Sequence, residues 1–202
     1  MKDLEKTSEI VRKAKAYSRE KHEGQIRKFE NKPYFIHPKR VAHILYQFKE
    51  SKNIDLLVAV CYLHDVVEDT TTTIQDIKKE FGSFIANLVK ELTSDASRIE
   101  EVGKEEYLAR KMIAMSSYAL SIKLADRLDN VNRLQWQPKS FSDKYIKQTR
   151  YIVDRLLRER KKLSMPQKLM LREIDRHLGD EAEEDIDYLS FDSYMKRAGD
   201  KK

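Results

Sequence analysis

The segment from Cys61 to Thr70 places four ionisable side chains within an otherwise apolar run. Residues four apart lie on one face of a helix, so we expect Glu68 one turn beyond His64 and Asp69 one turn beyond Asp65. The adjacent His64 and Asp65 can approach one cation from neighbouring directions. Burying such groups without a partner is costly, and a divalent cation would offset that cost. The alternative is a helix C-terminus with a solvated acidic tail, so further ligands elsewhere in the chain would decide between the two.

Two other segments carry such groups. One precedes the apolar run and contributes His37, and the other follows it and contributes Asp126. In chain order the candidate metal ligands form an H…HD…D pattern made of His37, His64, Asp65 and Asp126. A mixed set of imidazoles and carboxylates suits Mn, Fe or Zn better than Ca or Mg, which prefer oxygen ligands. The pattern therefore predicts a transition-metal site.

Three separated motifs resemble those of the HD-domain metal-dependent phosphohydrolases. They are HxGQxRK with YxxHP in residues 22–38, LHDVVEDT in residues 63–70, and IKLADRLxN in residues 122–130. More narrowly, the pattern is similar to the hydrolase domain of the RelA/SpoT family, which breaks down the alarmone (p)ppGpp. The resemblance covers about residues 22–134. Because the chain lacks room for synthetase and regulatory domains, it resembles the small, hydrolase-only alarmone hydrolases.

The resemblance implies roles for five further residues. Glu68 and Asp69 occupy the HDxxED positions, which handle the attacking water and its proton. We expect Glu68 to act as general base or acid and Asp69 to orient the water or Glu68. Arg27 and Lys28 match the family's RK pair beside the nucleotide, where a guanidinium can stack on a purine and an ammonium can meet phosphate. Asn130 matches the family's substrate-contacting Asn and could bind a ribose or phosphate oxygen.

Some positions depart from the family pattern. Residues 29–32 read Phe-Glu-Asn-Lys, where the family commonly has a Ser-Gly-Glu-like stretch. Asp129 replaces a common His, and Arg133 stands where a small hydroxyl residue is frequent. We expect these changes to alter polarity near the nucleotide rather than the metal ligands. His22 also matches a family position, and we interpret it as a structural residue that orients its loop.

The resulting hypothesis is a manganese-dependent (p)ppGpp 3′-pyrophosphohydrolase with one Mn²⁺ per chain. It would convert guanosine 3′,5′-bis(diphosphate) to GDP and pyrophosphate. The nearest alternative is an HD phosphohydrolase acting on another nucleotide or a dinucleotide cofactor. An alternative of another class is a noncatalytic module that binds nucleotides or a protein partner. The carboxylate pair Glu68 and Asp69 argues against it, because binding alone needs no proton-transfer groups.

Composition supports a small cytoplasmic enzyme without a nucleic-acid or membrane partner. The single cysteine, Cys61, excludes an internal disulfide and suits a reducing cytosol. No apolar stretch is long enough to cross a membrane, and the N-terminus does not resemble a signal peptide. The net charge of +6 arises from 40 basic and 34 acidic residues. The densest basic run, residues 155–162, is interpreted as a solvated helix face. Oligomeric state is left open.

The 202 residues, with only 5 Gly and 4 Pro, predict one all-α domain. We expect an HD-domain helical bundle over residues 1–202, with a motif core at 22–134 and additional C-terminal helices at 142–197. Residues 22–36 are expected to form a loop or short hairpin, and residues 93–103 a polar loop. Thr73 can cap a helix with Asp76. The expected helices are 3–21, 37–49, 55–68, 74–81, 83–92, 104–116, 118–135, 142–163, 166–178 and 180–197.

Overall fold

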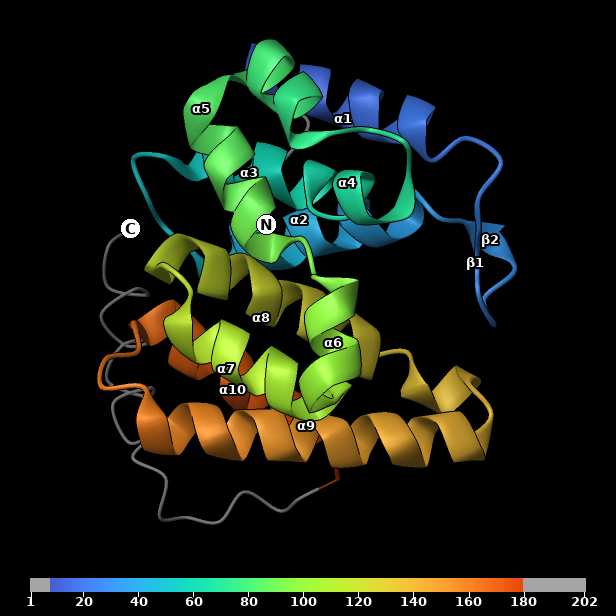
Figure 1. The fold of residues 1–202 in the computed structure, drawn as a ribbon, viewed down its shortest axis with the longest axis vertical. Coiled ribbons are helices and arrows are strands. Elements are labelled where there is room, and N and C mark those ends of the chain that lie inside the picture. The colour runs from blue at the N-terminus through green and yellow to red at the C-terminus, as the bar shows by residue number, and fades with distance from the viewer. Residues whose placement is uncertain (1–7, 180–202) are drawn as a thin grey trace, which may run out of the picture.

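The computed structural model describes residues 8–179 and shows a predominantly helical bundle (Figure 1). In chain order the elements are α1 (Glu9–Lys21), β1 (Ile26–Arg27), β2 (Lys32–Pro33), α2 (Ile36–Phe48), α3 (Ile54–Leu63), α4 (Val66–Asp69), α5 (Ile74–Leu92), α6 (Ala96–Val102), α7 (Lys104–Ala114), α8 (Ser117–Val131), the 3₁₀ turn η1 (Leu134–Trp136), α9 (Lys139–Glu159) and α10 (Met165–His177). The expected all-α class is confirmed. The expected helix over residues 180–197 lies outside the described residues.

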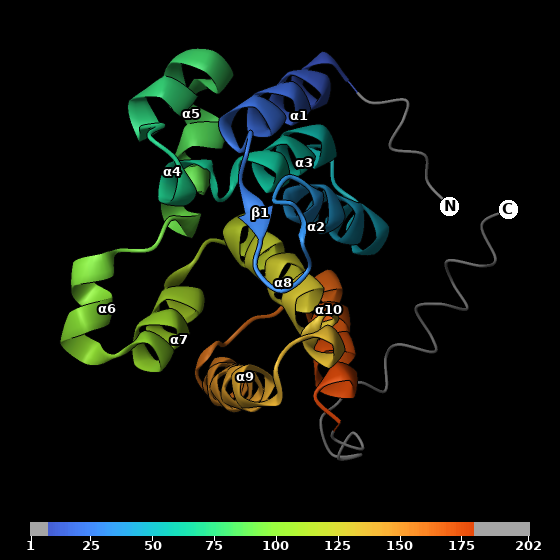
Figure 2. The same ribbon diagram turned by 90° about the vertical axis from the view of Figure 1, so that its right-hand side faces the viewer.

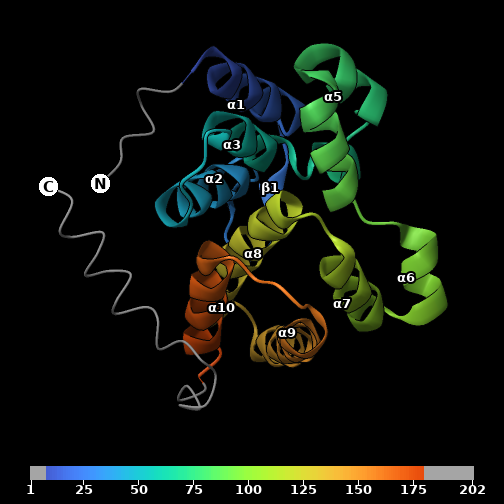
Figure 3. The same cartoon turned by 90° about the vertical axis from the view of Figure 1, so that its left-hand side faces the viewer.

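Helices α3 and α8 form the centre of the molecule. Helix α8 contacts α2, α3, α5 and α10, while α3 also contacts α1, α2 and α5. Figure 2 and Figure 3 show α8 between the layer that contains α1–α3 and the layer that contains α9 and α10. Every residue from Leu57 to Leu63 is buried, because this helix is apolar on all sides and packs against neighbours on several faces. The core therefore holds the last turn of α3 firmly in place.

The expected continuous helix over residues 55–68 is wrong. Helix α3 ends at Leu63, and α4 begins only at Val66. The imidazole Nδ1–H of His64 donates to the Cys61 carbonyl at 2.8 Å, which satisfies a carbonyl at the helix terminus. Asp65 Oδ2 lies 3.1 Å from His64 Nε2, so these adjacent side chains meet at the junction between α3 and α4.

The expected polar loop over residues 93–103 is also wrong, since it contains helix α6. The Asp95 carboxylate caps this helix by accepting from the amides of Ser97 at 3.1 Å and Arg98 at 3.3 Å. Gly103, with a φ of 84°, ends it. The cap was readable as Asp95 before a short helix-forming stretch, but polar composition obscured it.

Other local expectations are confirmed. The amide of Asp76 donates to Thr73 Oγ1 at 3.2 Å, and the amide of Thr73 donates to Asp76 Oδ2 at 2.9 Å, so the capping box is present. Gly82, with a φ of 81°, interrupts the helical geometry of α5. Strands β1 and β2 form the short hairpin, with Ile26 opposite Pro33.

The C-terminal helices begin and end earlier than expected. Helix α8 ends at Val131 and is followed by η1, and α9 covers Lys139–Glu159 because Pro138 stands at its start. Within residues 8–179, no helix combines the length and apolarity needed to cross a membrane. Location in the cytoplasm and the single-domain organisation stay predictions.

Candidate metal centre

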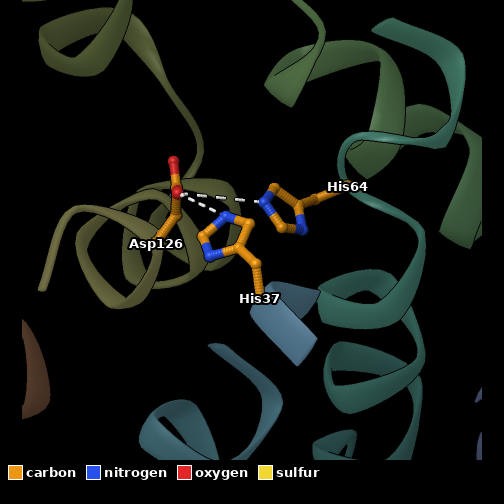
Figure 4. Close-up of side chains that lie close together, drawn as sticks. All are labelled: His37, His64 and Asp126. Atoms are coloured by element: carbon orange, nitrogen blue, oxygen red, sulfur yellow. Dashed lines mark ion pairs between the residues drawn. The ribbon is translucent and has the colours of Figure 1, made fainter. Parts of the chain in front are cut away.

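Three helices bring together two imidazoles and a carboxylate. His37 lies in the first turn of α2, His64 directly follows α3, and Asp126 lies in α8 (Figure 4). Metal-binding atoms of these three residues lie within 4.8 Å of one another. His37 Nε2 is 3.1 Å and His64 Nε2 is 3.9 Å from Asp126 Oδ1. All three residues are buried, so the cluster is not a chance surface grouping.

Asp65, the fourth predicted ligand, lies against the same cluster. Its Oδ2 atom is 3.1 Å from His64 Nε2 and 3.6 Å from His37 Nε2. The Tyr34 hydroxyl donates to this oxygen at 2.7 Å and fixes the carboxylate. The structure therefore places Asp65 beside both imidazoles of the cluster that His37, His64 and Asp126 form. Tyr34 is a supporting residue to which the sequence reasoning assigned no role.

Hydrogen bonding leaves both imidazole Nε2 atoms available to a cation. The Nδ1–H of His64 is occupied by the Cys61 carbonyl, and the Nδ1–H of His37 donates to Asp129 Oδ2 at 2.7 Å. Within the described chain, the buried Nε2 of His64 makes no hydrogen bond, although Asp65 lies within reach. A buried nitrogen beside a carboxylate without a hydrogen bond is the arrangement expected for two ligands of one cation. The donor set thus fits a divalent metal.

The electrostatics of the cluster also favour a cation. Burial alone would raise the pKa of Asp126, but the ammonium of Lys123, 2.9 Å away, and the two imidazoles hold it well below its usual range. Burial opposes ionisation of Asp65 too, but His64 lowers the pKa of that carboxyl. Burial would lower the pKa of His64, and the charge of Asp65 outweighs it and raises the pKa to about 9. Two buried carboxylates thus attract positive charge, which a proton supplies when a metal is absent.

The predicted proton-transfer residues lie just beyond the ligands, on α4. Glu68 is exposed, and its Oε2 atom accepts from the Ser94 amide at 2.8 Å. Burial, followed by the charge of Asp65, raises the pKa of Asp69. These two neighbouring carboxylates on α4 occupy different surroundings. Asp69 adjoins the ligand Asp65, and Glu68 is tied to the segment that follows α5.

The three predicted substrate contacts line one cavity of about 180 Å³. Its lining comprises Arg27, Lys28, Phe29, Tyr34, Asn130, Leu134, Gln137, Phe141 and Tyr145. The Asn130 Nδ2 atom donates to Asp126 Oδ1 at 2.8 Å, and its Oδ1 atom accepts from Arg27. Asn130 therefore joins the cavity directly to the metal cluster. A larger cavity, of about 1090 Å³, is lined by residues of α5, α6 and α7 and by none of the four predicted ligands.

The cavity contains residues that the sequence reasoning did not find. Phe141 lies edge-on to Phe29 at 5.2 Å between ring centroids and stacks on Tyr145 at 6.0 Å. The Oε1 atom of Gln137 is buried and has no hydrogen-bond partner among the described residues. These residues come from the segment after α8, which has no motif that would have identified them.

Two residues that follow α1, His22 and Gln25, connect this part of the chain to Asp69 of α4. His22 is buried, and its Nδ1 atom shares a hydrogen bond with Gln25 Oε1 at 2.8 Å, while the Gln25 amide donates to the Asp69 carbonyl at 2.8 Å.

The expectation that the Asp129 departure spares the metal ligands is wrong, because its carboxylate contacts the His37 ring directly. No local pattern relates His37 and Asp129, which are 92 positions apart.

The fold and the site together define a class of protein. A family model described as HD domain matches residues 14–161, so the chain belongs to the HD domain family. Its most similar solved structures include a metazoan ortholog of SpoT that hydrolyzes ppGpp and plays a role in starvation responses. That chain is 30% identical with a TM-score of 0.71, and the match covers 85% of this chain and 97% of the other.

Longer relatives match the same region. A GTP pyrophosphokinase of Myxococcus xanthus is 35% identical over 134 residues, which are 62% of this chain and 17% of the relative. A guanosine-3′,5′-bis(diphosphate) 3′-pyrophosphohydrolase of Aquifex aeolicus is 36% identical over 130 residues, which are 63% of this chain and 18% of the relative. The chain therefore spans less than a fifth of the length of these relatives.

Proposed function

We propose that this protein is a metal-dependent (p)ppGpp 3′-pyrophosphohydrolase that converts guanosine 3′,5′-bis(diphosphate) and water to GDP and pyrophosphate. The observation that carries the proposal is the junction at Asn130. This residue contacts the metal-cluster carboxylate Asp126 on one side and the cavity residue Arg27 on the other. A nucleotide seated in the cavity would thus present a phosphate group to the cluster. The names of the similar proteins agree with this substrate.

His37, His64, Asp65 and Asp126 are the proposed metal ligands. Their mixture of nitrogen and oxygen donors favours Mn²⁺ over Ca²⁺ or Mg²⁺, and one ion per chain fits the one such cluster found within residues 8–179. When bound, such an ion stabilises negative charge on a phosphate oxygen.

The chain's own carboxylates would handle the proton. Glu68 is the proposed general base that accepts a proton from water as the water oxygen bonds to the phosphorus attached to the 3′-oxygen. The bond between that phosphorus and the 3′-oxygen breaks, and the proton passes to the 3′-oxygen, which leaves GDP and pyrophosphate. Asp69, whose pKa is raised by burial and by Asp65, is the proposed group that orients the water. Tyr34 supports the arrangement by holding the Asp65 carboxylate through a hydrogen bond of 2.7 Å.

The cavity offers groups suited to a guanine nucleotide. Phe141 and Tyr145 supply aromatic faces on which a base can stack. Lys28 brings positive charge to the cavity for phosphate, and the guanidinium of Arg27 can stack on the purine. The unpaired acceptor of Gln137 suits the N–H donors on the base-pairing edge of guanine.

The test is to incubate Mn²⁺-loaded protein with ppGpp and a panel of adenosine polyphosphates and dinucleotide cofactors, and to identify every product. We expect GDP and pyrophosphate from ppGpp, and loss of both products in a His64→Ala control. Faster turnover of another nucleotide would favour the alternative HD phosphohydrolase. Binding without turnover of any nucleotide would favour the noncatalytic module.

A further inference from the structure

Arg40 lies one turn after His37 on α2 and connects two buried carboxylates. Its Nε atom donates to Asp129 Oδ1 at 2.6 Å. Its two terminal nitrogens donate to the two oxygens of Glu30 at 2.9 Å each. The guanidinium thus uses three donors in a planar fork, a geometry that no other side chain reproduces. The side chains of Glu30 and Asp129 are only 8% and 2% exposed, so these contacts are largely shielded from water.

Each carboxylate holds a residue of the proposed site with its other contacts. Asp129 Oδ2 accepts from His37 Nδ1 and so fixes the plane of a proposed metal ligand. Glu30 Oε1 accepts from Arg27 Nε at 3.0 Å and so fixes a proposed nucleotide contact. Burial would raise the pKa of both carboxyls, but hydrogen bonds from Arg40 and their other partners lower it, which keeps them ionised.

These contacts close a ring. From Arg40 one path runs through Asp129 and His37 to Asp126, and the other runs through Glu30, Arg27 and Asn130 to the same carboxylate. Glu30 and Asp129 are both positions where the chain departs from the family pattern. Arg40, which lies outside every motif, therefore connects Glu30 and Asp129, two positions that depart from the family pattern.

We propose that Arg40 is a positioning residue that aligns the His37 imidazole with the metal site and Arg27 with the nucleotide cavity. The inference rests on the proposed function, which identifies these two residues as ligand contacts. Arg40 is neither a proposed metal ligand nor a residue of the cavity lining, and it acts through Asp129 and Glu30.

The direction of the change in Mn²⁺ affinity distinguishes positioning by Arg40 from the effect of its charge. Arg40 is a cation close to a cation site, so removing its charge alone would strengthen Mn²⁺ binding. Loss of positioning would instead weaken Mn²⁺ binding, by roughly tenfold, the lower end of the effect of outer-shell partners. A lysine at this position keeps the charge but cannot span both carboxylates, so it should also weaken binding.

The experiment measures Mn²⁺ affinity by electron paramagnetic resonance, without substrate, for the wild type, Arg40→Ala, Arg40→Lys and the matched control Lys39→Ala. Lys39 is the exposed neighbour on the same helix. We expect weaker binding in both Arg40 variants, wild-type binding in the control, and a raised KM for ppGpp in the Arg40 variants only. Unchanged or tighter Mn²⁺ binding in folded Arg40→Ala overturns the proposal. If that variant fails to fold by circular dichroism, Arg40→Lys decides by the same criterion. A wild type that binds Mn²⁺ but does not hydrolyse ppGpp would overturn the proposed function separately.

Discussion

Removal of the metal should make the stability of this protein strongly dependent on the protonation of His64. The charge of Asp65 raises the pKa of this buried imidazole from 6.5 to about 9, even though burial opposes the change. Below pH 6.5 the native and unfolded states both hold the proton, and the stabilisation is complete. Between the two pKa values only the native state holds it, so stability falls by about 1.4 kcal/mol per pH unit. The total loss by pH 9 is about 3 kcal/mol, from a difference of about 2.5 pKa units.

The assay is urea unfolding of chelator-treated protein, followed by circular dichroism, at several pH values from about 6 to 10. Wild type is compared with His64→Asn, whose amide can still donate to the Cys61 carbonyl, and with His43→Asn as a control on the exposed face of α2. Burial lowers the pKa of Lys111 to about 8, so this residue changes the free energy of unfolding with pH in the opposite direction. The quantity to measure is therefore the difference in the free energy of unfolding between wild type and His64→Asn. We expect that difference to shrink by about 3 kcal/mol as the pH rises. Equal pH profiles for wild type and His64→Asn would refute the reasoning.

Five further substitutions test the site. Asp126→Ala should lose Mn²⁺, measured by metal analysis, and keep its helical circular dichroism; full occupancy would remove it from the ligand set. Glu68→Gln should lower kcat by about 10²–10⁴-fold with metal retained, and a wild-type kcat would exclude it as general base. Arg27→Ala should reduce the preference for ppGpp over an adenine analogue, and Gln137→Leu should reduce the same preference by about tenfold. Lys28→Ala should instead raise KM for all polyphosphates, and this increase should depend on the salt concentration. An unchanged preference in the first two variants would remove them from the base pocket.

The sequence by itself determined the helical class and the chemistry of the site. Helix formation depends on the spacing of apolar residues and on caps such as Thr73 with Asp76, which are local and readable. The types of the four predicted ligands also indicated which cations suit the site. Both features depend on side-chain chemistry that does not require knowledge of distant neighbours. Where a local pattern was weak, as at the Asp95 cap of α6, the expectation was wrong.

Tertiary structure alone decided how these groups meet. The helix breaks after Leu63 because core packing and the His64 contact with Cys61 outweigh continued helical hydrogen bonding. Arg40 and Asp129 are 89 positions apart, and no local periodicity predicts that they form an ion pair. No local pattern predicts the position of Gln137 either, since it lines the cavity only because the chain turns back after α8. Contacts between distant residues depend on the packing of whole helices, which is why they could be found only in the folded protein.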